Sequence, residues 1–208
     1  MAHTAIVALG RQYGSGGREI GEKLARLMNV PFYDRELIAL AAQKSGISPE
    51  TYASIDETAT NSLLYALSTG AFMFSSHFTS VSELPMNDKL YILQNKIINE
   101  IAEKDGSCVI VGRCADYILR DNPNCVSVFI HAPLEKRVER VAKKEGLSLQ
   151  AAETLITRTD KKRANYYNFY TNREWGCTTN YDLSISSYPM GSDNVAQVLL
   201  EYIKRREN

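Results

Sequence analysis

The segment that most constrains the fold of this chain lies close to its start. An apolar run, Ala5 to Leu9, has the composition of a buried β-strand, and four glycines follow from position 10 to position 17. A helical pattern then begins, with Ile20, Leu24 and Leu27 on one face. A glycine-rich turn between a strand and a helix directs backbone N–H groups toward a phosphate. The sequence therefore predicts a phosphate-binding loop made of Gly14, Ser15, Gly16, Gly17, Arg18 and Glu19.

This loop departs from the Walker A pattern, which ends in Gly-Lys-Ser/Thr, with the lysine on the β- and γ-phosphates and the hydroxyl on Mg²⁺. In one register Gly17 stands at the lysine position and Arg18 at the hydroxyl position. In the register shifted by one residue, Arg18 replaces the lysine. A guanidinium supplies the same charge in a planar fork. We predict that Arg18 takes the role of the lysine. Neither register supplies the hydroxyl, so the residues that would bind Mg²⁺ are left unassigned.

Composition favours an ordinary soluble enzyme with one domain. The 208 residues include 24 Lys and Arg and 24 Asp and Glu, so the net charge of zero gives no global reason to expect nucleic acid as a partner. No apolar run approaches the roughly 20 residues that cross a bilayer, and no signal peptide precedes the first strand. The four cysteines form no Cys-x-x-Cys pair, which argues against structural zinc and disulfides. We expect a cytoplasmic protein without a membrane partner.

Strand and helix patterns alternate along the chain. Apolar strand patterns recur at 30–33, 107–111, 126–130 and 182–186, and helical patterns lie between them, most clearly at 88–104. Ser148 is typical of the N-cap of a long helix that continues toward Tyr170. Five short apolar strands joined by helices predict an α/β fold with a five-stranded parallel sheet, in a single domain over residues 1–208. Residues 48–85 break the alternation and are interpreted as a helical insertion.

Residues that follow the strands are the first candidates for a site, because ligands of parallel α/β sheets bind at the carboxyl ends of the strands. Asp34 follows the second strand, and Arg113 follows the third strand after one glycine. Both are expected to face the ligand. His131 ends the fourth strand and is interpreted as an ordinary neutral histidine, since the sequence offers it no partner.

Two helices after the fourth strand carry clusters of charge. In the first, Glu135 and residues 137–140 are interpreted as surface charges on a helix. In the second, cations and one acid precede a group of aromatic residues, in the order Arg158, Asp160, Lys161, Lys162 and Arg163. This second cluster is either a solvated helix face or a phosphate-binding one.

Five motifs spread along the chain resemble one known family. They are Gly14-Ser15-Gly16, Phe32-Tyr33-Asp34, Val109 to Arg113, Glu135 to Arg140 and Arg158 to Arg163. Together they resemble the cytidylate kinase-like family of P-loop kinases, bacterial relatives of the nucleoside monophosphate kinases. The resemblance extends over almost the whole chain and is weak only at residues 48–85. It implies a three-layer α/β/α P-loop kinase fold, with an acceptor-binding insertion at about 34–104 and a lid at about 150–177.

The resemblance also implies an activity and a set of site residues. It implies an ATP-dependent kinase that transfers the γ-phosphoryl group to a nucleoside monophosphate, with CMP or dCMP as the foremost acceptor and Mg²⁺ as the cofactor that accompanies ATP. Residues 14–19 would bind ATP. The residues that would stabilise the transferred group are Arg18, Arg158 and Arg163. Those that would bind the acceptor are Asp34, Arg113 and Asp160.

Two other functions stay open at this point. The acceptor could be a small hydroxylated metabolite, as in shikimate-type kinases. The chain could also be a nucleotide-binding regulator without catalysis, because its loop lacks the usual lysine and hydroxyl. A regulator has no need of Arg158 and Arg163, so these arginines favour a kinase. The apolar residues Phe72, Met73, Phe74 and Phe78 fit either an acceptor pocket or the surface of a homodimer.

Overall fold

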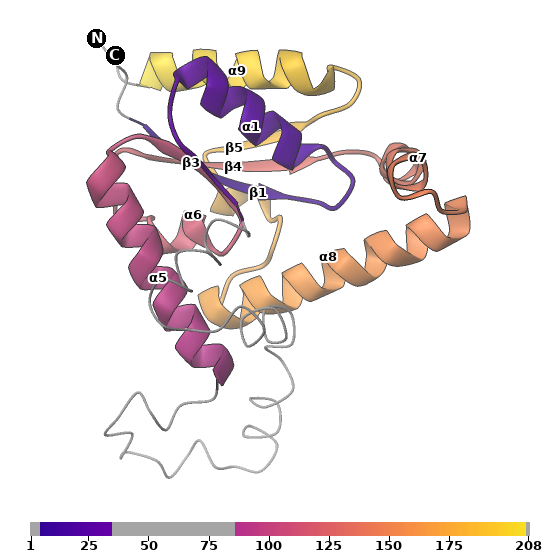
Figure 1. Ribbon diagram of the computed structural model, residues 1–208, viewed down its shortest axis with the longest axis horizontal. Helices are drawn as coiled ribbons and strands as arrows, with labels where there is room; N and C mark the ends of the chain where they lie inside the picture. The colour runs from indigo at the N-terminus through magenta and orange to yellow at the C-terminus, as the bar shows by residue number, and fades with distance from the viewer. Residues whose placement is uncertain (1–4, 35–85, 207–208) are drawn as a thin grey trace.

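One parallel sheet organises residues 5–34 and 86–206, the part of the chain that the computed structural model describes (Figure 1). The strands are β1 (Ile6–Arg11), β2 (Phe32–Tyr33), β3 (Cys108–Val111), β4 (Cys125–His131) and β5 (Leu183–Ser186). Their order is β2-β3-β1-β4-β5, and every neighbouring pair is parallel. In central β1, Val7 pairs with Val109 on one side and Val126 on the other. The predicted five-stranded parallel sheet is confirmed.

Side chains of β1 alternate between two apolar layers, as expected for a strand buried on both faces. Val7 and Leu9 pack in a cluster with residues of α1 (Gly17–Met28) and α9 (Gly191–Arg206). Ile6 and Ala8 pack in a second cluster with Ile98 of α5 (Met86–Asp105) and with α6 (Ala115–Ile118). Figure 1 shows α1 and α9 on one side of the sheet and α5 and α6 on the other. The result is the expected three-layer α/β/α arrangement.

Two further helices lie beyond the layers that cover the sheet. They are α7 (Leu134–Glu145) and α8 (Leu149–Thr171). The predicted cap at Ser148 is confirmed, because its Oγ accepts the backbone N–H of Ala151 at 3.2 Å. The first half of α8 packs on α7, and its last turns reach α5, where Tyr170 stacks on Tyr91 with ring centroids 4.1 Å apart. Helix α8 therefore extends from α7 to α5 (Figure 1).

The boundaries of the predicted elements hold to within a few residues in the described part of the chain, but two short elements were not predicted, α6 and a 3₁₀ helix at Thr178–Asn180. Helix α5 extends the predicted 88–104 segment by two residues at its start and one at its end. The four-residue α6 was missed, because it is too short to show a helical period. The four cysteines are free, as predicted. The helical insertion predicted at 48–85, with its apolar residues at 72–78, lies outside the described residues, as does most of the acceptor-binding insertion expected at about 34–104.

The packing of α5 generates a stability prediction. Ile98 is completely buried against the sheet, whereas Ile92 on the same helix is 45 % exposed. We expect Ile98→Ala to lower the free energy of unfolding by about 3 kcal/mol, because it removes buried methyl groups and leaves a cavity. Ile92→Ala is the matched control and should cost less than about 0.5 kcal/mol. Urea unfolding measures both, and equal costs would mean that α5 does not pack on the sheet as described.

Candidate functional site

The glycine-rich loop after β1 has a conformation and surroundings that only glycine permits at two of its positions. Gly14 and Gly16 adopt φ values of 80° and 82°, in the left-handed region that side chains disfavour. A Cβ on Gly14 would also lie 2.9 Å from Val141, and one on Gly16 would lie 3.1 Å from the Arg140 guanidinium. Ser15 is buried, and its Oγ donates to the carbonyl of Gln12 at 2.8 Å. The loop is therefore tightly folded, with α7 packed against it.

A carboxylate from α8 holds this loop in place. Asp160 accepts the backbone N–H of Tyr13 on Oδ1 at 2.7 Å and the guanidinium of Arg137 on Oδ2 at 2.6 Å. Arg137 also donates to the carbonyls of Tyr13 and Ala132, both at 3.2 Å. With a side chain only 9 % exposed, Arg137 depends on these acceptors. Asp160 thus connects the loop, α7 and α8, and both of its oxygens are occupied by protein donors.

The first turn of α1 forms a second network at the loop. Glu19 accepts the hydroxyl of Ser192 and the ammonium of Lys23 and forms an ion pair with Arg140. These contacts, above all the hydrogen bond from Ser192, lower the pKa of Glu19 to about 2. Glu19 is therefore ionised at neutral pH and holds Arg140 beside Gly16. In this arrangement Glu19 orients a cation toward the loop.

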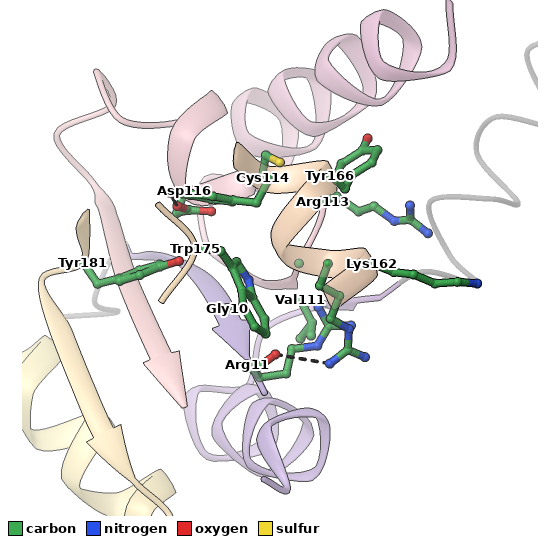
Figure 2. A pocket seen from close by; sticks show the side chains of 13 residues that line it. Gly10, Arg11, Val111, Arg113, Cys114, Asp116, Lys162, Tyr166, Trp175 and Tyr181 are labelled. Atoms are coloured by element: carbon green, nitrogen blue, oxygen red, sulfur yellow. Dashed lines mark hydrogen bonds between the residues drawn. The ribbon is translucent and has the colours of Figure 1, made fainter. Parts of the chain in front are cut away.

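Next to the loop, a cavity of about 110 Å³ is lined by arginines at the carboxyl ends of β1 and β3 (Figure 2). Arg11 enters it from β1, Arg113 from the end of β3 and Arg163 from α8. The backbone carbonyl of Arg11 accepts the guanidinium of Arg163 at 3.2 Å, which fixes α8 at this place. Three guanidinium groups at one cavity favour an anionic ligand, because planar forks bind phosphate through paired hydrogen bonds.

The segment that carries Arg113 has an uncommon backbone conformation. Gly112, Arg113 and Cys114 adopt φ values of 80°, 60° and 55°, one after another. Non-glycine residues in the left-handed region cost on the order of 1 kcal/mol each, and such residues cluster at ligand sites. The turn places Arg113 at the cavity, and the next residue, Cys114, is the N-cap of α6.

The inner wall of the cavity is aromatic and contains one buried acid. The Tyr167 hydroxyl donates to Asp116 Oδ2 at 2.7 Å, and burial raises the pKa of Asp116. Trp175 packs edge-on against Phe129, with ring centroids 5.4 Å apart, and lines the same cavity (Figure 2). This wall offers an apolar surface and an acceptor to the part of a ligand that lies beyond the arginines.

Arg18 and Asp34, predicted on opposite sides of the site, contact each other. Arg18 Nε donates to Asp34 Oδ2 at 2.8 Å, and its second nitrogen lies 2.7 Å from the same oxygen. Arg18 also pairs with Glu22 at 3.2 Å, and its side chain is 59 % exposed. Asp34 is buried. In this structure the Arg18 guanidinium is therefore directed toward the end of β2, and its role at the transferred phosphate stays a prediction.

The two arginines predicted for the lid have different surroundings. Arg163 reaches the arginine-lined cavity, whereas Arg158 is exposed and is not among the described residues that line it. Lys162 lines the cavity beside Arg163. The structure thus brings together Arg113 and Arg163, places Asp160 at the loop, and leaves Arg158 at the surface.

Sequence reasoning missed three arginines at this site. Arg11 is the last residue of β1, and the same strand-end rule that selected Arg113 would have found it. The interpretation of residues 137–140 as surface charges was wrong for Arg137, whereas Arg140 is exposed as predicted and still contacts the loop. Arg137 is buried beneath the loop, and Arg140 lies against Gly16. Sequence gives no signal for Arg137, because a charged residue within an amphipathic helix is normally solvated.

A second cavity, about 350 Å³, opens on the other side of the loop, between α7 and the segment before α9. It is bounded by Gly14 and Ser15, by Lys136 and Arg140, and by Tyr188. The Ser187 hydroxyl donates to the Ser15 carbonyl at 2.6 Å and so connects this segment to the loop. The loop therefore lies between two cavities, one rich in arginine and one bounded by cations and a tyrosine.

The described residues contain no group of three or more His, Cys, Asp or Glu side chains that could hold a metal ion. Among the carboxylates near the loop, Asp34 and Asp160 are both engaged by arginines. Within the same part of the chain, no helix combines the length and the apolar character needed to cross a membrane.

A sequence model described as the Cytidylate kinase-like family matches residues 6–188. Among curated relatives, the cytidylate kinase of Thermococcus sibiricus is 31 % identical over 103 residues, which cover 47 % of this chain and 50 % of the relative. The chain thus spans about half the length of that relative. The cytidylate kinase of Methanobrevibacter smithii is 20 % identical over 200 residues, which cover 96 % of this chain and 98 % of the relative.

Solved structures share the fold. An uncharacterised protein from Eubacterium ventriosum has a TM-score of 0.72 and 31 % identity, covering 97 % of this chain and 99 % of that one. A gluconokinase from Sinorhizobium meliloti has a TM-score of 0.55 and 13 % identity, with coverages of 99 % and 94 %. The shikimate kinase of Acinetobacter baumannii has a TM-score of 0.51 and 13 % identity, with coverages of 98 % and 95 %. At this identity the two kinases support the fold alone, which is the P-loop kinase fold.

The contacts of Asp160 generate a prediction. Asp160→Asn keeps an oxygen for the Tyr13 N–H but removes the charge that faces the buried Arg137. We expect a loss of about 3 kcal/mol in the free energy of unfolding, because a buried charge is left without its partner. Glu201→Gln, which breaks an exposed ion pair with Lys204, is the control and should unfold like the wild type. Urea denaturation measures the free energy of unfolding of both variants. Equal midpoints would show that Asp160 does not hold the loop.

Proposed function

Because the chain belongs to the cytidylate kinase-like family, we propose that it is an ATP-dependent phosphotransferase whose acceptor is a nucleoside monophosphate, CMP or dCMP foremost. One observation carries this proposal. The glycine-rich loop, an anion-binding element, packs through Gly17 on Arg11, and Arg11 lines a cavity together with Arg113 and Arg163. Two phosphate-binding elements in contact are what a phosphoryl transfer between two nucleotides requires.

The donor would bind at the loop. Backbone N–H groups of residues 14–18 and the N-terminus of α1 would hold the β-phosphate. The cavity of about 350 Å³ next to Tyr188 has room for the donor nucleoside, and Arg140 and Lys136 supply charge at its rim. Mg²⁺ would enter as part of the MgATP substrate, held mainly by phosphate oxygens. The carboxylates of Asp34 and Asp160 would not be needed as metal ligands, because both already pair with arginines.

The acceptor would bind in the arginine-lined cavity, with its phosphate on Arg113. An oxygen of this phosphate would form a bond to the γ-phosphorus, and the bond between the γ-phosphorus and the β,γ-bridging oxygen would break. The electron pair of that bond would leave with ADP. No base is needed, because a phosphate monoester is largely ionised at neutral pH. The protein would contribute orientation and positive charge.

Helix α8 would act as the lid. Its residue Arg163 is at the cavity, and Arg158 on the same helix would join the phosphates when the lid closes over them. Closure would exclude water and so limit wasteful hydrolysis of ATP. Asp160, also on α8, would act as a positioning residue, because its two oxygens hold Tyr13 and Arg137.

A small hydroxylated metabolite is the second candidate acceptor, and the buried carboxylate of Asp34 at the end of β2 is the observation in its favour. A hydroxyl must lose its proton during transfer, and a carboxylate is the group that accepts it. Asp34 is bound to Arg18, however, so it would have to exchange this partner first. The arginines therefore favour a phosphate acceptor.

The proposed activity can be tested with a panel of acceptors. Wild-type protein is incubated with MgATP and each nucleoside monophosphate, shikimate or gluconate, and ADP release is measured. We expect release that depends on a nucleoside monophosphate and is highest with CMP or dCMP. Release only with the hydroxyl acceptors would select the second candidate. ATP binding without any release would instead indicate a nucleotide-binding regulator.

The proposed contact between Arg113 and the acceptor phosphate gives a second prediction. Arg113→Lys keeps the charge but loses the planar fork, so the KM for the acceptor should rise about tenfold, because a bidentate contact is lost. The KM for ATP should change little. Steady-state kinetics with each substrate varied in turn provide the measurement. A rise in the KM for ATP alone would place Arg113 on the donor side.

A further inference from the structure

The full Walker A pattern, Gly-x-x-x-x-Gly-Lys-Ser/Thr, spans eight positions. With Gly16 as its second glycine, the pattern extends from residue 11 to residue 18. Its first glycine is then replaced by Arg11, and its lysine is replaced by Gly17. The cation and the glycine have thus exchanged places at the two ends of the loop.

The structure gives a physical reason for the exchange. A Cβ built on Gly17 would lie 2.5 Å from the Cβ of Arg11 and 3.0 Å from its Cγ. Gly17 is the first residue of α1 and has no positive φ, so its backbone alone would accept a side chain. Space is the constraint. Only one of the two positions can carry a long side chain.

The guanidinium of Arg11 extends from the loop toward the end of β3. It occupies the space that a Cβ on Gly112 would need, and it lines the same cavity as Arg113 (Figure 2) and Arg163. Burial lowers the pKa of Arg11, and the nearby charges of Arg163 and Arg113 lower it further, while Asp34 and Asp160 act in the opposite direction. The neighbouring carboxylates Asp34 and Asp160 each bind another arginine. The surroundings of Arg11 therefore favour an anion as its partner.

We propose that Arg11 supplies, from the end of β1, the cation that a Walker A lysine supplies from the first turn of the helix. Its guanidinium contacts the phosphoryl group in transfer, between the loop that holds the donor and Arg113, which holds the acceptor. This role rests on the proposed function. Arg18, the other candidate, is directed toward Asp34 and Glu22 instead.

The γ-phosphate contact can be tested by calorimetry, without catalysis. The measured quantity is the ratio of the affinities for MgATP and MgADP. We expect Arg11→Ala to lower this ratio about tenfold, since a charge-assisted contact to the γ-phosphate is lost. The turnover number should fall on the order of 10²-fold. Arg26→Ala, the control, removes an exposed arginine from α1 and should leave both quantities unchanged. An Arg11→Ala protein with the wild-type ratio would overturn the proposal.

A reciprocal exchange gives a sharper test. Arg11→Gly combined with Gly17→Lys restores the usual arrangement, and it should recover most of the ratio lost in Arg11→Gly alone. Gly17→Lys alone should not improve binding, because Arg11 occupies the space. Thermal unfolding verifies that each variant is folded. A double variant no better than Arg11→Gly, despite being folded, would contradict the proposed equivalence of the two positions.

Different results would overturn the proposed function and the role of Arg11. If the wild-type protein binds neither MgATP nor MgADP, the proposed function and the role of Arg11 are both overturned. If the wild type binds nucleotides and transfers phosphate, but Arg18→Ala and not Arg11→Ala lowers the affinity ratio, only the role of Arg11 is overturned. The lysine substitute would then be Arg18.

Discussion

The carboxylate of Asp160 is the contact on which the geometry of the site depends. One of its oxygens holds the backbone of the glycine-rich loop, and the other holds Arg137, which itself donates to two carbonyls beneath the loop. Arg163 lies on the same helix, less than one turn further along. The contact that fixes the loop therefore also fixes the position of Arg163 at the cavity, so one side chain aligns the loop with the arginine-lined cavity.

The second constraint is the concentration of positive charge beside the loop. Three guanidinium groups share one cavity, and Arg113 reaches it only through consecutive left-handed residues. Like charges this close oppose folding unless an anion lies between them. A protein that keeps such an arrangement gains affinity for phosphates at some cost in stability. The exchange of Arg11 and Gly17 fits this view, because it moves the cation from the helix toward the cavity that Arg113 lines.

The sequence predicts the sheet and most of the helices, because buried strands and amphipathic helices have clear periods. The rule that strand ends face the ligand also selects Arg113, which lines the cavity, whereas the role of Asp34 in a ligand site stays a prediction. The sequence does not predict that Arg18 pairs with Asp34, since 16 residues separate them and their approach depends on the packing of α1 on β2. Arg137 could not be found either. Its burial arises from a contact with α8, 23 residues away, and not from its own helix.

A crystal structure with a bisubstrate analogue tests most directly whether the loop, Arg11 and Arg113 bind the phosphates. In this analogue adenosine and cytidine are joined by a chain of five phosphates. We expect the phosphate chain to cross from residues 14–17 to Arg113, with Arg11 and Arg163 on its middle phosphates. Adenosine should lie beside Tyr188, and cytidine toward Trp175. A phosphate chain bound away from the glycine-rich loop, or one that Arg11 does not contact, would contradict this expectation.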